Sequence, residues 1–166
     1  MKTRARIRFG AALVVGAVLA AAAGSGGCAS RYVKGTKIPD TKDNRAIIDV
    51  LRRYQRAVEA KDVSAIVSLA APTYHEGLGT VGGEDDYGYD RLPVRLTDRF
   101  SKIKSLRYVV TVSKIEVTGS RASVFYTYEL RFQYLVEGVE RWSTETADHR
   151  MMLERGDGGW RIVAGL

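Results

Sequence analysis

The sequence predicts an α+β domain in which N-terminal helices pack on one face of a curved antiparallel sheet, preceded by an export signal. Two changes of pattern along the 166 residues support this prediction. A basic and then apolar leader ends at the only cysteine, Cys28. Beyond it, apolar residues recur at helical spacing until about Ile103, after which they alternate with polar residues. Helices followed by a run of strands are typical of α+β domains.

The first 27 residues have the three parts of a bacterial signal peptide. Four Lys and Arg residues come first, residues 9–23 are uncharged and rich in Ala, Val and Leu, and residues 25–27 are small. The apolar run is shorter than the roughly 20 residues that a permanent membrane-spanning helix needs. A removable lipoprotein signal over residues 1–27 is therefore predicted.

Gly27 and Cys28 resemble the lipobox of bacterial lipoproteins, in which the cysteine sulfur is acylated. Ser25 departs from that pattern, because Leu or Val is usual three places before the cysteine. The resemblance implies that Cys28 begins an exported chain that is lipid-anchored to the cell envelope, at the outer membrane or the periplasmic face in a Gram-negative cell. Such an anchor is strong because each buried methylene contributes about 0.8 kcal/mol. The alternative is an ordinary secretory signal followed by an incidental free thiol.

Removing the leader changes the charge of the chain. The whole sequence carries 26 Lys and Arg against 19 Asp and Glu, a formal charge of +7. Four of the bases lie in residues 1–27, which leaves 22 against 19, or +3. With so small an excess and interspersed signs, the mature chain is not predicted to bind nucleic acid. No cysteine follows Cys28, so neither a disulfide nor a thiolate metal site is expected in the domain, and no cofactor is predicted.

Residues 28–40 predict a short polar tether that spaces the domain from the membrane, and one domain is expected over residues 41–166. Asp40 or Thr41 caps a first helix. This helix is expected to run to about Ala60, because apolar residues recur along one face of it.

Two further helices are predicted, with a loop between them. Asp62 caps a short second helix that ends before Pro72. Residues 73–92 are rich in glycine and acidic residues and predict a loop. A third helix is expected from residue 92 or 93 to Lys102, with a proline in its first turn.

In the C-terminal half, apolar and polar residues alternate as they do in long antiparallel strands. The apolar phase slips near residues 113–114, which predicts a bulge that bends the first strand. The strands are expected over about residues 106–117, 122–136, 140–154 and 160–164, with turns at Gly119, Gly138 and residues 156–159.

This order of elements resembles the cone-shaped fold of nuclear transport factor two, whose relatives include ketosteroid isomerase and the SnoaL-like cyclases. Residues 51–69 (LRRYQRAVEAKDVSAIVSL) are similar to the opening of that fold, where one helix ends near an Asp and the next begins. Residues 159–162 (GWRI) are similar to its closing strand. The resemblance covers residues 41–166 and implies a pocket between the concave sheet and the helices.

In ketosteroid isomerase a tyrosine on the first helix and two acids line the pocket, and the resemblance gives Tyr54 the place of that tyrosine. Counting along the sequence puts the general base near Gly77 or Leu78, neither of which accepts a proton. Glu76 is the nearest carboxylate, although a neighbouring strand residue points the other way. The sequence therefore offers no clear base, and Tyr54 as a core residue with a satisfied hydroxyl is the alternative.

His75 precedes Glu76, and a histidine beside a carboxylate can activate a water molecule. The catalytic candidates are therefore Tyr54, His75 and Glu76, against the alternative that His75 is an ordinary loop histidine. His149 lies in a predicted strand between charged neighbours and is expected on the surface. Two histidines without a third close ligand do not predict a zinc site, so no metal is expected.

Residues 84–90 (EDDYGYD) form the most unusual stretch. Its four carboxylates could supply oxygen ligands to calcium, but their spacing is not that of a helix–loop–helix calcium motif. The favoured interpretation is a solvated loop whose tyrosines, Tyr87 and Tyr89, pack over the pocket mouth or the domain edge. Over the pocket, this loop would act as a lid or a partner contact.

The tyrosine-rich face of the strand predicted over residues 122–136 is expected to form the pocket wall if the cone is open. The candidate lining residues are Tyr54, Tyr126, Tyr128, Phe132 and Trp142. Aromatic walls with a few hydroxyls suit a flat apolar ligand or a partner segment.

We therefore expect a membrane-anchored envelope lipoprotein whose pocketed domain binds a small apolar ligand or a protein partner without catalysis. The alternative is a SnoaL-like isomerase, dehydratase or hydrolase that acts on a small apolar substrate. The resemblance also implies a homodimer formed through the open face of the sheet.

Overall fold

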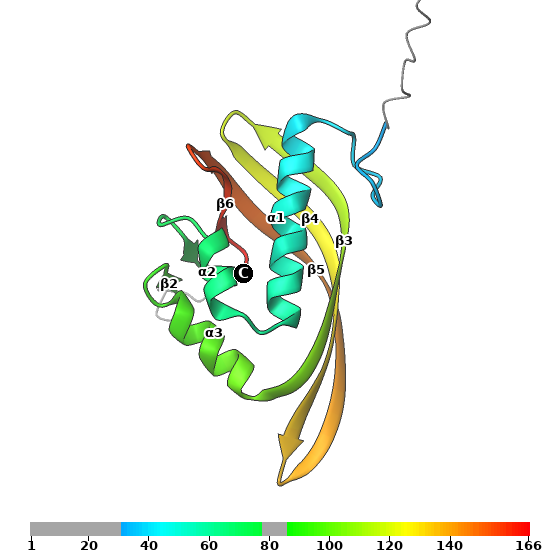
Figure 1. The fold of residues 1–166 in the computed structure, drawn as a ribbon, viewed down its shortest axis with the longest axis vertical. Helices are drawn as coiled ribbons and strands as arrows, with labels where there is room; N and C mark the ends of the chain where they lie inside the picture. The colour runs from blue at the N-terminus through cyan, green and yellow to red at the C-terminus, as the bar shows by residue number, and fades with distance from the viewer. Residues whose placement is uncertain (1–30, 78–85) are drawn as a thin grey trace, which may run out of the picture.

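The computed structural model describes residues 31–77 and 86–166, so the predicted leader, Cys28 and the first two acidic residues of 84–90 lie outside the described residues. Within the described part, three helices come first in the sequence, with a short hairpin between the second and the third. A four-stranded antiparallel sheet follows, which confirms the predicted α+β fold (Figure 1). The elements are α1 (Lys42–Glu59), α2 (Val63–Leu69), β1 (His75–Glu76), β2 (Tyr87–Gly88), α3 (Leu92–Ser101), β3 (Ile103–Thr118), β4 (Arg121–Val136), β5 (Val139–Gly156) and β6 (Gly159–Ala164).

The helices begin at their predicted caps. The Thr41 hydroxyl accepts a hydrogen bond from the Asn44 backbone N–H at 3.1 Å and caps α1. The Asp62 carboxylate accepts one from the Ala65 backbone N–H at 2.9 Å and caps α2. Pro93 occupies the first turn of α3, where its missing N–H is not needed.

The strands β3 to β6 form a meander in which each strand pairs with the next in sequence. The pairing of β3 with β4 shifts register between Val112 and Lys114, which confirms the bulge predicted near residues 113–114. Across the bulge, the Ser113 hydroxyl donates to the Phe125 carbonyl at 3.0 Å. A bulge bends its strand, and the long strands curve around α1 so that their concave face is turned to the helices (Figure 1).

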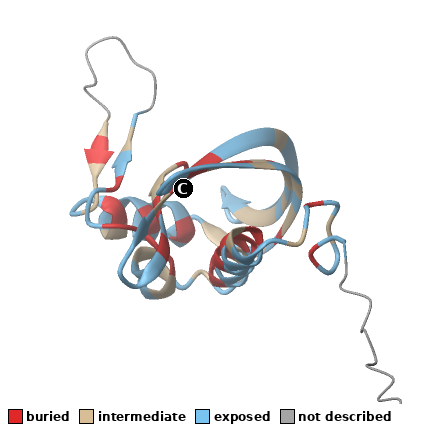
Figure 2. Cartoon of the chain, turned by 90° about the horizontal axis from the view of Figure 1, so that it is seen from above, coloured by how far each residue is buried: buried red, intermediate tan, exposed pale blue. Residues whose placement is uncertain are grey.

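The core lies between this concave face and the inner sides of the helices (Figure 2). Ile47 of α1 and Ile66 of α2 are fully buried, as are Val124, Met151 and Ile162 on the sheet. The helical period of the first half and the period of two in the second half thus supply the two sides of one hydrophobic cluster.

A short hairpin occupies part of the segment predicted as a loop over residues 73–92. His75 pairs with Gly88 and Glu76 pairs with Tyr87, which joins β1 and β2 in an antiparallel pair. Two residues in each strand are too few to show a period in the sequence. The loop prediction is therefore corrected at this point, and the hairpin brings Glu76 and Tyr87 to the rim of the core.

Residues 31–40 fold onto the domain as a tight turn, which we name the N-terminal turn. Val33 and Ile38 are buried against Ile48 of α1, and the Val33 backbone N–H donates to the Ile38 carbonyl at 2.9 Å. The prediction of a polar tether that spaces the domain is thus corrected over these residues. Two apolar residues five positions apart show no period in the sequence, yet their burial holds the turn in place.

The N-terminal turn and the connection between β4 and β5 lie at opposite ends of the molecule (Figure 1). None of the described helices is long and apolar enough to cross a membrane. Exposed apolar side chains gather at the β4–β5 end, where they comprise Leu135, Val136, Val139 and Trp142.

Candidate ligand-binding cavity

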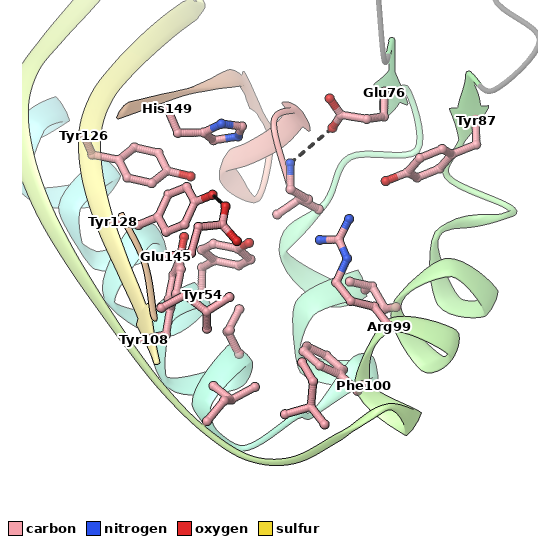
Figure 3. A pocket seen from close by; sticks show the side chains of 16 residues that line it. Tyr54, Glu76, Tyr87, Arg99, Phe100, Tyr108, Tyr126, Tyr128, Glu145 and His149 are labelled. Atoms are coloured by element: carbon pink, nitrogen blue, oxygen red, sulfur yellow. Dashed lines mark hydrogen bonds between the residues drawn. The ribbon is translucent and has the colours of Figure 1, made fainter. Parts of the chain in front are cut away.

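A cavity of about 410 Å³ lies between the concave face of the sheet and helices α1 and α3 (Figure 3). Rings and aliphatic side chains make up most of its wall, and a few charged groups lie at its edge. The lining residues are Tyr54, Val58, Glu76, Tyr87, Leu96, Arg99, Phe100, Ile103, Leu106, Tyr108, Tyr126, Tyr128, Leu130, Glu145, His149 and Leu166.

Three buried tyrosines from different elements form the inner wall: Tyr54 on α1, Tyr108 on β3 and Tyr126 on β4. The Tyr54 and Tyr108 rings meet edge to face, with their centroids 5.9 Å apart. The Tyr108 hydroxyl interacts electrostatically with the hydroxyls of Tyr54 and Tyr126. The three hydroxyls thus form one polar group inside the aromatic wall.

Burial is the main reason that the pKa of each of these hydroxyls lies well above the ordinary tyrosine value of about 10. The neighbouring tyrosines add to this effect, because two ionised phenols close together would repel each other. All three hydroxyls therefore stay protonated across the physiological range of pH. They can donate hydrogen bonds to a ligand, but they are poor sources of a proton or a charge.

Tyr128, Glu145 and His149 form the outer, polar edge of the cavity. The Tyr128 hydroxyl donates to Glu145 Oε1, and this hydrogen bond, followed by burial, raises the pKa of Tyr128 to about 12. The His149 ring stands edge-on to Tyr126 and Tyr128, with centroid distances of 5.5 and 6.2 Å. His149 is exposed, so its imidazole lies between the aromatic wall and solvent.

Glu76 holds the last residues of the sequence in place. Its Oε2 accepts hydrogen bonds from the Tyr74 hydroxyl at 2.5 Å and from the backbone N–H groups of Gly165 and Leu166 at 2.9 and 3.2 Å. Gly165 has φ of +87°, and a side chain there would collide with the Arg150 carbonyl, so this turn requires glycine. The bond to Leu166, drawn in Figure 3, positions a lining residue of the cavity.

Arg99 brings a positive charge to the cavity from α3, and its guanidinium points inward (Figure 3). Among the described residues it has no ion-pair partner. Its charge partly offsets the effect of burial on the Tyr54 pKa. A guanidinium carries several donors in a rigid plane, so Arg99 can bind an acceptor oxygen of a ligand.

The structure brings three predicted lining residues, Tyr54, Tyr126 and Tyr128, to this cavity. Phe132 shares their face of β4 but lies further along the strand. It lines an adjoining hollow of about 670 Å³ together with Tyr134. The aromatic face of β4 therefore extends past the cavity.

Trp142 lies on the opposite face of the sheet, which corrects its predicted place in the pocket. It pairs directly with Gln133, and directly paired residues of antiparallel strands point to the same face. The residue is 55% exposed, and the centroid of its ring lies 5.0 Å from the Arg131 guanidinium. An odd number of positions along β5 separates Trp142 from Met151 and Leu153, which are buried in the core, so Trp142 faces the other way.

His75 points away from the cavity, which corrects the predicted pair with Glu76. The two residues are consecutive in β1, and consecutive strand side chains face opposite sides. His75 Nε2 lies instead 3.6 Å from Asp86 Oδ2 at an exposed position. Tyr54 and Glu76 both line the cavity, yet no hydrogen bond joins them within the described part of the chain.

Only residues 86–90 of the acidic stretch are described. Tyr87 is buried, lines the cavity and lies 5.2 Å from the Arg95 guanidinium, as expected of a tyrosine packed at the pocket mouth. Over residues 31–77 and 86–166, His, Cys, Asp and Glu side chains form no group of three that could hold a metal ion.

Four polar lining residues, Tyr108, Arg99, Glu145 and His149, were not expected in the cavity. For His149 the signal lay in the strand register. The tight turn after β4 sets Tyr126 opposite His149, so the two side chains share the concave face. The predicted exposure of His149 is met, but the same residue also lines the cavity.

The bent sheet, the helices enclosed by it and the cavity between them define an α+β cone of the nuclear transport factor two kind. The model of one family within this class, the SnoaL-like domain, matches residues 39–164. The chain belongs to the SnoaL-like family.

Solved structures share the fold at low sequence identity. A protein from Kribbella flavida is 15% identical, with a TM-score of 0.63 over 74% of this chain and 87% of its own. A candidate dehydratase of the nuclear transport factor two-like family from Streptomyces avermitilis is 15% identical, with a TM-score of 0.62 over 74% and 93%. A candidate scytalone dehydratase from Novosphingobium aromaticivorans is 13% identical, with a TM-score of 0.61 over 74% and 80%. No curated protein matches the sequence.

Replacement of Glu76 measures its role as the acceptor for three donors. Glu76→Ala leaves these donors without their partner, so we expect the free energy of unfolding to fall by about 1–3 kcal/mol. Glu76→Gln keeps a carbonyl oxygen and should lose less than half as much. Urea unfolding measures both variants, with Asp98→Ala on the exposed surface of α3 as the control that changes little. Unchanged stability in Glu76→Ala would contradict this role.

Proposed function

We propose that the protein is an exported, lipid-anchored envelope protein whose cavity binds a small, flat, largely apolar ligand without transforming it. The observation that carries the binding role is the aromatic inner wall with its protonated hydroxyls. A volume of about 410 Å³ is within the range of small-molecule sites. Rings stack well against rings, so a planar ligand gains most from this wall.

The polar groups of the cavity indicate what such a ligand carries. The buried tyrosine hydroxyls are donors at physiological pH, and Arg99 supplies further donors from the opposite side. Glu145 is already engaged by the Tyr128 hydroxyl. The cavity therefore favours a ligand with an acceptor oxygen, such as a carbonyl or a phenolic oxygen.

The state of the carboxylates supports binding over catalysis. Proton abstraction requires a base that is free and aimed at the substrate. Glu76 Oε2 already accepts three hydrogen bonds, and Glu145 accepts one from Tyr128. The two carboxylates thus have structural partners in the absence of a ligand.

One observation favours the alternative of a SnoaL-like isomerase, dehydratase or hydrolase. His149 lines the cavity, and an imidazole can act as a general base near neutral pH. It lies beside Tyr126 and Tyr128, whose hydroxyls could stabilise a developing negative charge. In this alternative His149 takes the place that the sequence suggested for His75.

The anchor is supported by the leader and by the position of Cys28. A basic segment, an apolar segment and small residues precede the cysteine, as in bacterial lipoproteins. Arg31, the first residue of the N-terminal turn, is three positions from the proposed acylation site.

Filling the cavity should abolish ligand binding. With 2-naphthol as a flat probe that carries one oxygen, we expect Leu130→Trp to weaken binding at least tenfold, or about 1.4 kcal/mol, because the larger ring occupies the ligand's space. Val136→Trp, at an exposed position on the same strand, is the matched control and should bind as the wild type does. Titration calorimetry measures the affinities. Equal affinity in the Leu130 variant, or no binding by the wild type, would refute the proposed site.

Deuterium uptake by a ketone substrate distinguishes the proposed binding role from the enzyme alternative. A base in the cavity would accelerate uptake of deuterium from solvent at the carbons next to the carbonyl of 2-tetralone. We expect the rate of deuterium uptake, measured by mass spectrometry, to equal the rate in buffer alone. An acceleration that His149→Gln removes and that His75→Gln keeps would establish the enzyme alternative instead.

The anchor predicts the mass of the protein recovered from membranes. We expect the intact mass to correspond to residues 28–166 with acyl groups on Cys28, and Cys28→Ala to prevent this modification. Mass spectrometry of the detergent-extracted protein measures both. A soluble protein with an unmodified thiol would rule out the anchor.

A further inference from the structure

The net charge of the mature chain is concentrated next to the proposed anchor. Residues 31–42 carry four Lys or Arg and one Asp, an excess of three. Residues 43–166 carry 18 Lys or Arg and 18 Asp or Glu, which leaves no net charge. The excess of +3 after the leader therefore lies entirely in twelve residues that include the N-terminal turn.

The N-terminal turn is ordered in a way that leaves its lysines exposed. Val33 and Ile38 are buried, and the chain between them is held because the Thr36 backbone N–H and hydroxyl both donate to the Val33 carbonyl at 2.9 Å. Lys34 and Lys37 lie between the two buried residues and are exposed. The turn thus leaves two ammonium groups exposed to solvent.

The basic groups of this segment have no acidic partner within the described part of the chain. Asp40, the one acid, pairs with Arg45 at 2.7 Å. The four bases that remain without an ion pair among the described residues are Arg31, Lys34, Lys37 and Lys42, which we name the basic surface. The Arg31 guanidinium also lies 5.7 Å from the ring of Tyr32, which is 42% exposed. An exposed tyrosine beside cations is typical of protein surfaces at a membrane interface.

The chain length keeps the basic surface close to the anchor. Three residue steps separate Cys28 from Arg31, and even fully extended they span only about 11 Å. This distance is comparable to the Debye length of about 8 Å at physiological ionic strength. If Cys28 is acylated, the basic surface cannot leave the field of the lipid headgroups.

We infer that the basic surface binds anionic phospholipid headgroups and thereby fixes how the domain stands on the membrane. The inference rests on the lipid anchor of the proposed function. Clustered lysines and arginines beside a lipid anchor add electrostatic attraction to the hydrophobic insertion. The basic surface then faces the membrane, and the β4–β5 end of the molecule points away from it (Figure 1).

Lysine labelling on vesicles tests this inference. The acylated protein is placed in vesicles of phosphatidylcholine alone, and in vesicles with phosphatidylglycerol added, and treated with an amine-reactive reagent. We expect Lys34, Lys37 and Lys42 to react roughly fivefold more slowly with the anionic lipid present, and high salt to restore their rates. Lys102, which lies near the other end of the molecule, should react equally in both. Mass spectrometry of peptides measures the rates.

Two double variants supply the matched controls. Lys34→Gln with Lys37→Gln should remove most of the protection of Lys42, because headgroup attraction falls with the number of charges. Lys102→Gln with Lys104→Gln removes as much charge elsewhere and should leave Lys42 protected. Thermal unfolding followed by circular dichroism checks that both variants fold.

The outcomes separate the surface from the anchor. Acylated protein with equal labelling in the two kinds of vesicle would overturn the inference and leave the anchor standing. Equally slow labelling of the three lysines in vesicles of phosphatidylcholine alone would show that proximity to the membrane, and not headgroup charge, shields them. That result would also overturn the inference. An unmodified Cys28 in the same sample would overturn the anchor and the inference together.

Discussion

The bend of the sheet around α1 is the constraint on which the cavity depends. A flatter sheet would pack against α1 along its whole length and leave no space between them. The register shift between Val112 and Lys114 bends β3, and the partner of Val112 across the sheet is Tyr126, a lining residue. The inner wall is therefore placed by backbone pairing and not by a loop, which gives the aromatic side chains fixed positions before any ligand arrives.

Because tyrosines form the wall, their buried hydroxyls also need polar partners. A buried hydroxyl without a partner destabilises a fold, and within the described residues no buried side-chain nitrogen or oxygen lacks one. The hydroxyls of Tyr54, Tyr108 and Tyr126 interact with one another, whereas the Tyr128 hydroxyl donates to Glu145 at the edge. A ligand oxygen can accept a hydrogen bond from this group of hydroxyls. Under the proposed function, affinity then comes mainly from the rings, and the hydroxyls orient the ligand.

The order of the elements was predictable because its signals are long and local. The strands β3 and β4 alternate over 16 residues each, and the helix caps are single residues with a known hydrogen bond. The placement of side chains on β5 was not predictable from apolar residues alone, since Trp142 faces outward and His149 lines the cavity. The N-terminal turn depends on contacts of Val33 and Ile38 with Ile48 of α1, which no periodicity of the sequence indicates. The leader and the acylation of Cys28 stay predictions from the sequence.

The length of α1 separates the proposed membrane contact at the N-terminal turn from the cavity. Thr41 caps the end of α1 that adjoins the N-terminal turn, and Tyr54 lies toward its other end. At 1.5 Å per residue, the helix places Tyr54 about 20 Å from its cap. The cation that influences the pKa of Tyr54 is Arg99 of α3, and none of the causes of that pKa shift is a residue of the N-terminal turn. A domain held at the membrane through its N-terminal turn would therefore keep a cavity whose hydrogen-bonding groups are independent of the lipid surface, because contact and cavity lie at different points along one rigid helix.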